Sequence, residues 1–484
     1  MSSISVLNYS EIKRRNPTAD EAIEELDFTP IKITQIVDNS FLRFTNLKKL
    51  NLQGNNFSTV RENTFARLRE LTNLNLSNCG ITTFEDRPFF QLQQLKHLDL
   101  SNNDIRYVRS AESEYEISQN LLSALDNLLT LNLSNCNIVI VKPNTFEHME
   151  KLIRLDLSNN KIIEIKRSIS GLSLLPSIGS SKSAKSGQST HILSTVSTNS
   201  SNPKGTFAGL VSLQILLLNN NAITIIQPQA FYGLTSLKKL DLSHNGLSSL
   251  TMEKTFGPEN VVREFDISHN RLTTIHRSFI NMTSLQKLNL SSNALDLETD
   301  SGNIFTGLTG VSELDLSNNR IVIIRYNLLH PLSGIQLLDL SHNQIQRFDI
   351  GSLINIGKDA QIILEGNDII KISDINALTK DKLYDFLLSH QTQSINSGII
   401  DDQPVSDKLS SVGSDLSSLT SRASSNGSQH FRPVRPTTSQ SSSYRRRPGF
   451  GSETSFGGSN IFYDKYIKYQ QKSNELTELI NKKK

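Results

Sequence analysis

Leucines recur along this chain with a spacing that constrains its architecture. In the first regular copy Leu47, Leu50, Leu52, Asn55 and Phe57 occupy the frame LxxLxLxxNxF, which returns at a usual step of about 24 residues. The regular copies start at Leu47, Leu71, Leu95, Leu128, Leu152, Leu213, Leu237, Val262, Leu285, Val311 and Ile335. Two degenerate end copies bring the total to about thirteen, and they carry Ile23, Leu26, Phe28, Ile362, Leu364, Asn367 and Ile369.

The spacing of the frame predicts how each copy folds. LxxLxL ends in an alternation of inward leucines and outward residues, which indicates a short strand. The asparagine at the ninth place turns the chain, and we expect its amide to bond backbone groups of neighbouring turns that would otherwise be buried and unpaired. Between frames, Phe65, Phe207 and Phe231 supply a second apolar element. Because one coil cannot bury its own leucines, the coils must stack into an α/β repeat solenoid with one continuous core.

This frame resembles the leucine-rich repeats of the typical 24-residue class, found in Toll-like receptors, Slit-like proteins and chaoptin. The resemblance covers residues 23–378. It implies a horseshoe with a parallel β-sheet on the concave face and an irregular or short-helical convex side. The family binds proteins, lipids, glycans and nucleic acids, so the resemblance does not specify the ligand. Extracellular members usually carry cysteine-rich end modules, and neither end of this chain has a cysteine.

The two cysteines, Cys79 and Cys136, both stand at the ninth place of a frame, with one full repeat between them. We expect a separation of about 10 Å, which is beyond disulfide reach. The sequence therefore predicts two buried structural thiols rather than a redox site.

Five segments follow from these patterns. Residues 1–22 form an N-terminal arm or cap, and residues 23–378 form the solenoid. Residues 379–395 form a cap helix, in which Leu383, Phe386 and Leu387 cover the last core layer. Residues 396–460, rich in Ser, Arg and Gly, are predicted to be disordered, and residues 461–484 are predicted to be a C-terminal helix.

Two copies are longer than the others. The copy that starts at Leu95 holds about nine extra residues around 110–118. The copy that starts at Leu152 holds a Ser-rich insert over residues 167–203, which we expect to be a disordered loop. The insert is either a tolerated insertion or retained intron sequence, or else a phosphorylated or partner-binding loop.

Composition and motifs argue against a catalytic role. No nucleotide-binding, zinc-protease, EF-hand or nucleophile-elbow signature is present. The net charge of +3 is small, so it implies no overall electrostatic attraction to nucleic acid. An Asp-x-x-His pair recurs at Asp241 and His244 and at Asp266 and His269, but such places are routine outward positions, so no metal or other cofactor is predicted. A basic stretch with Arg445, Arg446 and Arg447 leaves a weak possibility of nucleic-acid binding.

The N-terminal sequence lacks the apolar segment of a signal peptide, and no run of 18 apolar residues occurs. As the sequence stands, a cytoplasmic protein is expected. If Met1 is not the true start, an extracellular or cell-surface location is the alternative.

Partner binding is expected on the outward residues of the strands. The third place of the frame is mostly basic, and the fifth place is acidic or amide, a mixture that suits a protein partner better than a polyanion. Neighbouring charges could instead satisfy one another. Ile215 and Leu217 break the polar pattern, which marks them as the best candidate for a contact centre unless the insert folds over them. The predicted partner-binding residues are Lys49, His97, Arg154, Ile215, Leu217, Lys239, Asp241, Glu264, Lys287 and Glu313.

Three functions remain open on these grounds. The first is a non-catalytic scaffold that recognises a protein partner through its concave face. The second is a cell-surface or secreted recognition, adhesion or innate-immune-type protein with an incomplete N-terminus. The third is a cytosolic regulatory subunit that acts through its tail.

Overall fold

The computed structural model describes residues 5–17, 22–29, 31–85, 87–108, 116–117, 119–165, 206–250, 255–257, 259–275, 278–297, 304–369 and 377–396. The chain divides into two compact units, Met1–His390 and Gln391–Lys484. The first unit contains all the repeats. The 167–203 insert, the 396–460 linker except its first residue, the 461–484 segment and the arginines at 445–447 lie outside the described residues.

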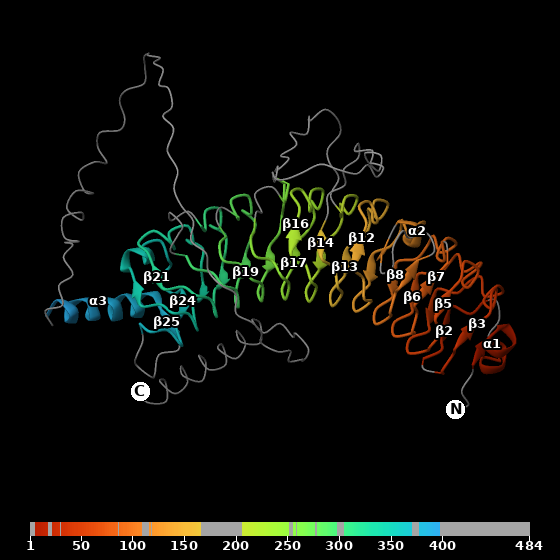
Figure 1. Ribbon diagram of the computed structural model, residues 1–484. Coiled ribbons are helices and arrows are strands. Elements are labelled where there is room, and N and C mark those ends of the chain that lie inside the picture. Colours follow the sequence, from red (N-terminus) through yellow and green to blue (C-terminus); the bar gives the residue numbers. More distant parts are fainter. Residues whose placement is uncertain are drawn as a thin grey trace, which may run out of the picture. The chain divides into compact units, whose positions relative to one another are not determined.

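A single long sheet runs through the first unit, one strand from each coil (Figure 1). It has 14 strands, which pair in parallel throughout except at its C-terminal edge. In order its parallel strands are β2 (Glu25–Asp27), β4 (Lys49–Asn51), β6 (Asn73–Asn75), β8 (His97–Asp99), β11 (Thr130–Asn132), β13 (Arg154–Asp156), β15 (Ile215–Leu217), β17 (Lys239–Asp241), β18 (Glu264–Asp266), β19 (Lys287–Asn289), β20 (Glu313–Asp315), β22 (Leu337–Asp339) and β24 (Gln361–Ile363). The predicted solenoid and its concave parallel sheet are therefore confirmed.

The two long copies do not interrupt the stack. Strands β13 and β15 pair in register, with Arg154 opposite Ile215 and Asp156 opposite Leu217, although the insert separates them in sequence. Strands β8 and β11 pair equally well across the shorter insertion. Extra residues between frames therefore leave the coil-to-coil register unchanged.

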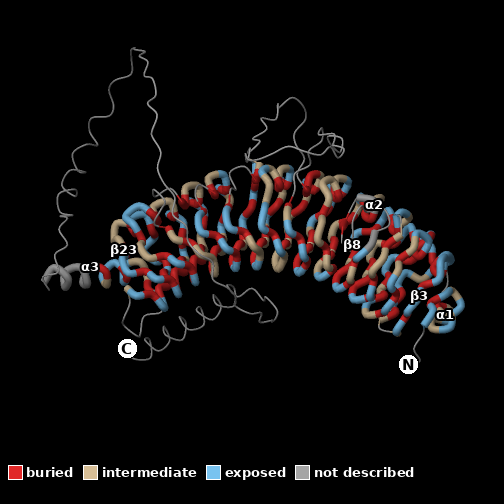
Figure 2. Tube along the Cα trace, in the orientation of Figure 1, coloured by how far each residue is buried: buried red, intermediate tan, exposed pale blue. Residues whose placement is uncertain are grey.

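The core follows the leucine frame. The inward residues of every coil are buried, and Figure 2 shows this buried layer continuing from coil to coil. Phenylalanines add a second apolar layer: the rings of Phe41, Phe65 and Phe89 stack at 6.4 and 6.3 Å, and those of Phe146 and Phe207 at 6.1 Å. The stacked rings are offset pairs of the kind that aromatic side chains prefer.

Asparagines at the ninth place form the expected ladder. The amide nitrogen of Asn103 donates to the carbonyls of Leu76 and Leu100, and its oxygen accepts from the backbone N–H groups of Cys79 and Ile81. Each such side chain thus joins two neighbouring coils through buried backbone groups, whose unpaired burial would cost free energy.

Both cysteines replace an asparagine in this ladder. The Cys79 thiol donates to the carbonyl of Leu52 at 3.0 Å, and the Cys136 thiol donates to that of Leu100 at 3.1 Å. Both are free and buried, as predicted, and burial raises the pKa of each thiol to about 12.

Short strands and helices cover the rest of each coil. The shorter sheets contain β5 (Thr59–Val60), β7 (Thr83–Phe84) and β9 (Tyr107–Val108); β10 (Glu116–Ile117) and β12 (Ile140–Val141); β14 (Glu164–Ile165) and β16 (Ile225–Ile226); and β21 (Ile323–Ile324) and β23 (Arg347–Phe348). The short helices between coils are α2 (Gln119–Leu122) and the 3-10 helix η2 (Ile350–Leu353).

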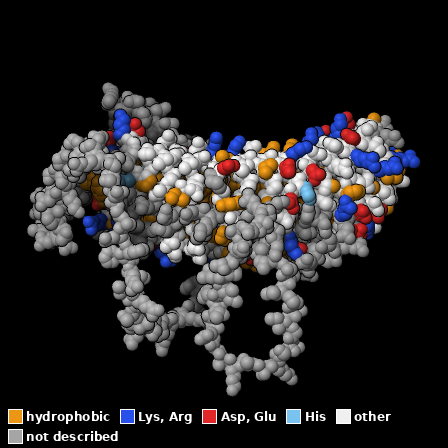
Figure 3. All heavy atoms as spheres, turned by 90° about the horizontal axis from the view of Figure 1, so that it is seen from above, with side chains coloured by type: hydrophobic (Ala, Val, Ile, Leu, Met, Phe, Trp, Pro, Cys, Tyr) orange, Lys and Arg blue, Asp and Glu red, His pale blue; other side chains and the backbone are white. Residues whose placement is uncertain are grey.

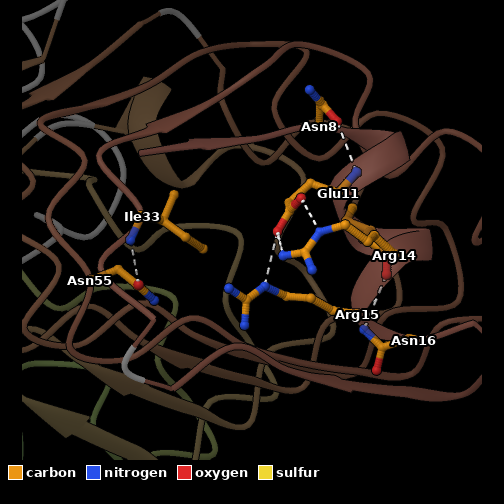
Figure 4. Close-up of polar contacts among 8 residues, drawn as sticks. Asn8, Glu11, Arg14, Arg15, Asn16, Ile33 and Asn55 are labelled. Atoms are coloured by element: carbon orange, nitrogen blue, oxygen red, sulfur yellow. Dashed lines mark hydrogen bonds and ion pairs between the residues drawn. The ribbon is translucent and has the colours of Figure 1, made fainter. Parts of the chain in front are cut away.

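At the N-terminal end the chain adds a partial coil before the first frame. Strand β1 (Val6–Leu7) pairs with β3 (Gln35–Ile36), and helix α1 (Tyr9–Arg15) follows it. The Asn8 side chain caps α1 by accepting from the Glu11 N–H, and Glu11 binds Arg14 and Arg15 (Figure 4).

The C-terminal end differs from the rest of the stack. Strand β25 (Ala377–Thr379) joins β24 antiparallel and leads directly into helix α3 (Lys380–Asn396). Leu383 and Leu387 of α3 are buried, and Phe386 packs against the core. No helix in the described ranges is long and apolar enough to cross a membrane.

Candidate functional site

The sheet register gathers the predicted binding residues into two columns. Third-place residues stand opposite one another from strand to strand, so Arg154, Ile215 and Lys239 are consecutive neighbours, followed by Glu264 and Lys287. Neighbouring strands lie about 4.8 Å apart, so each column is a row of side chains at that spacing.

The fifth place forms a second column beside the first. Its residues, in strand order, are Asp27, Asn51, Asn75, Asp99, Asn132, Asp156, Leu217, Asp241, Asp266, Asn289, Asp315, Asp339 and Ile363.

The N-terminal part of this face is hollowed. A depression of about 480 Å³ extends over β4, β6, β8, β11 and β13. Three predicted residues line it: Lys49, which pairs with Glu25 at 2.5 Å, His97, and Arg154. The lining also contains asparagines, a threonine, aspartates and the leucines Leu50, Leu74, Leu98 and Leu131, so this region offers both polar and apolar contacts.

The apolar pair lies at the C-terminal border of the hollow. Ile215 and Leu217 are partly exposed, and each has a polar residue on both sides in its column. Leu217 stands between Asp156 and Asp241. The structure thus presents these two apolar side chains within a polar surface, as their places in the frame predict.

Most charges of the third column pair along the solenoid. Lys239 contacts Glu264 at 3.4 Å, and Lys287 contacts Glu313 at 2.8 Å. Arg154 turns to Asp156 of its own strand at 3.2 Å. The alternative that neighbouring charges satisfy one another therefore holds for these residues, although lysines pair with third-place glutamates and not with fifth-place aspartates.

Asp241 is the most perturbed acid on this face. Burial, followed by repulsion from Asp266, raises its pKa from 3.8 to about 6. Its Oδ1 accepts from the backbone and hydroxyl of Ser243, and Asp266 makes the same contacts with Ser268.

The recurrent Asp-x-x-His pairs bring two histidines together. The rings of His244 and His269 stack with centroids 4.0 Å apart. Both residues have a positive φ, 54° and 52°, a left-handed conformation in which Asn and His are enriched among non-glycine residues. In the described part of the chain, no group of three or more His, Cys, Asp or Glu side chains is placed to hold a metal ion.

Some outward places of the frame are not at the surface. Asp315 and Asp339 are each 3% exposed, and Ile363 is 2% exposed. Alternation in the sequence puts all three in the fifth column. Ile363 pairs with Ala377 of β25, an antiparallel strand that the repeat pattern of the sequence does not predict.

Comparisons with known proteins agree with this geometry. The family model described as "Leucine rich repeat" matches residues 23–81, 69–113, 116–179, 200–247, 253–295 and 296–345. The solved structure of the TLR13–ssRNA13 complex is similar to the chain with a TM-score of 0.58 and 25% identity, covering 75% of this chain and 46% of that one.

Curated relatives match shorter stretches. Tsukushi of Mus musculus is 40% identical over 67 residues, which is 14% of this chain and 18% of Tsukushi. Lumican of Gallus gallus is 29% identical over 133 residues, 27% of this chain and 37% of lumican. The chain thus spans less than half the length of these relatives, and the similarity lies in the repeats. From its repeat register, its asparagine ladder and the family match, the chain belongs to the leucine-rich repeat family.

Proposed function

We propose that this leucine-rich repeat scaffold binds a protein partner on its concave face, with the contact centre at Ile215 and Leu217. The observation that carries the proposal is the partly exposed apolar pair inside a polar column. Apolar contact centres ringed by polar residues are typical of protein interfaces.

The surroundings of the pair also favour a protein ligand. The hollow over β4 to β13, which has charged and amide side chains in its lining, adjoins Ile215 and Leu217, because Arg154 and Asp156 line it and stand opposite them. Ion-paired lysines and glutamates lie on the other side. A surface with an apolar centre and charges of both signs suits another protein better than a nucleic acid, whose phosphates would require an excess of cations.

The test is capture of a partner by the full chain, followed by titration calorimetry with the purified partner. Ile215→Asp and Leu217→Asp should each weaken binding at least tenfold, since a contact centre commonly contributes 2 kcal/mol or more, as an order of magnitude. Matched controls are Ile163→Asp, just before strand β14, and Ile225→Asp, in strand β16. These side chains are 52% and 55% exposed, and they lie outside the inner sheet.

The apolar controls are informative because they expose more surface than the proposed centre. Figure 3, a view from above, shows apolar side chains scattered over the middle of the repeats. Lysines and arginines are more frequent toward the N-terminal end in the same view. If the controls abolish binding and the Ile215 and Leu217 variants do not, the concave face is not the binding site.

A further inference from the structure

Asp241 and Asp266 are carboxylates on adjacent strands of the inner face, and they differ from the ion-paired acids of that face. Asp156 pairs with Arg154, and the glutamates of the third column pair with Lys239 and Lys287. Within the described ranges, neither Asp241 nor Asp266 has an ion pair with a lysine or arginine. The Oδ2 atom of Asp266 accepts only from the neutral amide of Asn289, at 3.0 Å.

The two aspartates stand side by side and repel each other. Asp241 is opposite Asp266 in the fifth column, one strand apart. On its other side Asp241 adjoins Leu217, an apolar side chain that offers its carboxylate no polar partner. The raised pKa of Asp241 has these causes, since burial and the charge of Asp266 both disfavour its ionised form. A cation placed between the carboxylates would gain from both charges and remove the repulsion.

Other charged groups near the pair do not supply that cation. Lys239, on the same strand as Asp241, forms an ion pair with Glu264 at 3.4 Å, and its charge lowers the pKa of Asp241 less than burial and Asp266 raise it. His244 lies three residues after Asp241, and burial lowers its pKa, which favours its neutral form. His244 stacks on His269, the corresponding residue of the next coil.

The apolar pair, Ile215 and Leu217, lies close enough to Asp241 and Asp266 for a single peptide segment to contact both pairs. The midpoint between Asp241 and Asp266 is one and a half strand spacings from Leu217, about 7 Å. In an extended peptide, side chains two residues apart point to the same face and are separated by nearly the same distance, about 7 Å. An extended peptide that crosses the strands can therefore place one side chain over Leu217 and a second side chain between Asp241 and Asp266.

We infer that this surface takes an extended segment of a protein partner in which an apolar side chain is followed, two residues later, by lysine or arginine. The apolar side chain lies over Ile215 and Leu217, and the cation lies between Asp241 and Asp266. The inference rests on the proposed function and specifies the chemistry of the partner. A metal ion is disfavoured as the cation, because no third metal-binding side chain is in place among the described residues and Leu217 offers no ligand atom.

The experiment uses a random peptide library displayed on phage, selected against the immobilised full chain. The expected result is enrichment of peptides with an apolar residue and a lysine or arginine two positions after it. The Asp241→Asn, Asp266→Asn double variant should lose selection for the basic residue while keeping selection for the apolar one. Asp27→Asn is the matched control, because Asp27 is a fifth-place aspartate of strand β2 that lies outside both the hollow and the proposed site. It should select the same peptides as the unaltered chain.

Two further measurements separate the possible failures. A selected peptide should bind the double variant at least tenfold more weakly than the unaltered chain, and its affinity should fall between pH 7.5 and pH 5 as Asp241 becomes protonated. Unchanged basic selection by the double variant, or no enrichment of the motif, overturns the inference. If the Asp variants have no effect but Leu217→Asp abolishes peptide binding, the concave-face proposal survives and only the cation site is wrong.

Discussion

The imidazole rings of His244 and His269 lie parallel on neighbouring coils, with their centroids 4.0 Å apart and their planes 8° from parallel. Two neutral rings tolerate this contact, whereas two protonated rings would repel each other. Burial also lowers the pKa of His244, with Asp266 acting in the opposite direction. The stacked arrangement is therefore favoured at a pH at which both rings are neutral.

The first prediction concerns His244→Asn. A histidine whose pKa is lower in the folded chain than in the unfolded chain makes stability fall as pH decreases through its unfolded pKa. Asparagine fits the site, because Asn220 and Asn318 adopt the same left-handed conformation at the equivalent place. We expect the variant to lose less stability than the unaltered chain between pH 7.5 and 5.5, as measured by urea unfolding. A pH profile identical to that of the unaltered chain would show that the stack does not titrate in this range.

The second prediction concerns Asp241→Asn. Asp241 destabilises the fold at high pH, whereas His244 destabilises it at low pH. Because the folded pKa of Asp241 is about 6 and its ordinary value is 3.8, ionisation destabilises the fold above pH 6, and this cost is absent below about pH 4. Asparagine at the same place already bonds the serine two residues on, as Asn132 does to Ser134 and Asn289 to Ser291. The variant should therefore gain up to about 3 kcal/mol at pH 7.5 and nothing at pH 4. A gain that is equal at both pH values would contradict this account.

The third prediction concerns the thiols. A Cys79 or Cys136 thiol with a pKa of about 12 is almost never a thiolate at neutral pH, and both side chains are buried in the ladder. A thiol-specific reagent should label neither cysteine in the native chain and both in denaturant, read by mass spectrometry. Rapid native labelling of either one would mean that its coil opens locally.

The fourth prediction concerns the long insert. Removing residues 167–203 restores a repeat of about 24 residues between Leu152 and Leu213. Since β13 already pairs with β15 and β14 with β16, the shortened chain should fold with the same circular dichroism spectrum and a melting temperature within a few degrees. Partner binding by the shortened chain then tells whether the insert covers Ile215 and Leu217. A chain that no longer folds would assign the insert a structural role.

The repeat frame alone determined the coils, the strand positions, the inward leucines and the asparagine ladder. This was possible because each of these features depends on the spacing within one copy and on contact with the next identical copy. The columns of the concave face followed in the same way, since alternation along each strand assigns the third and fifth places of every repeat frame to the outward side. The consecutive aspartates 241 and 266 were visible in that column, although their mutual repulsion was not inferred from it.

The tertiary structure alone decided how the columns work. Lys239 reaches Glu264 on the next strand, Arg154 turns to Asp156 on its own strand, and Asp241 has no ion pair within the described part of the chain. These outcomes depend on side-chain reach and direction across a gap of about 5 Å. The burial of Ile363 depends on an antiparallel strand outside the repeat, so no spacing within the repeat could predict it. Local periodicity therefore fixed the scaffold, and contacts between coils fixed its chemistry.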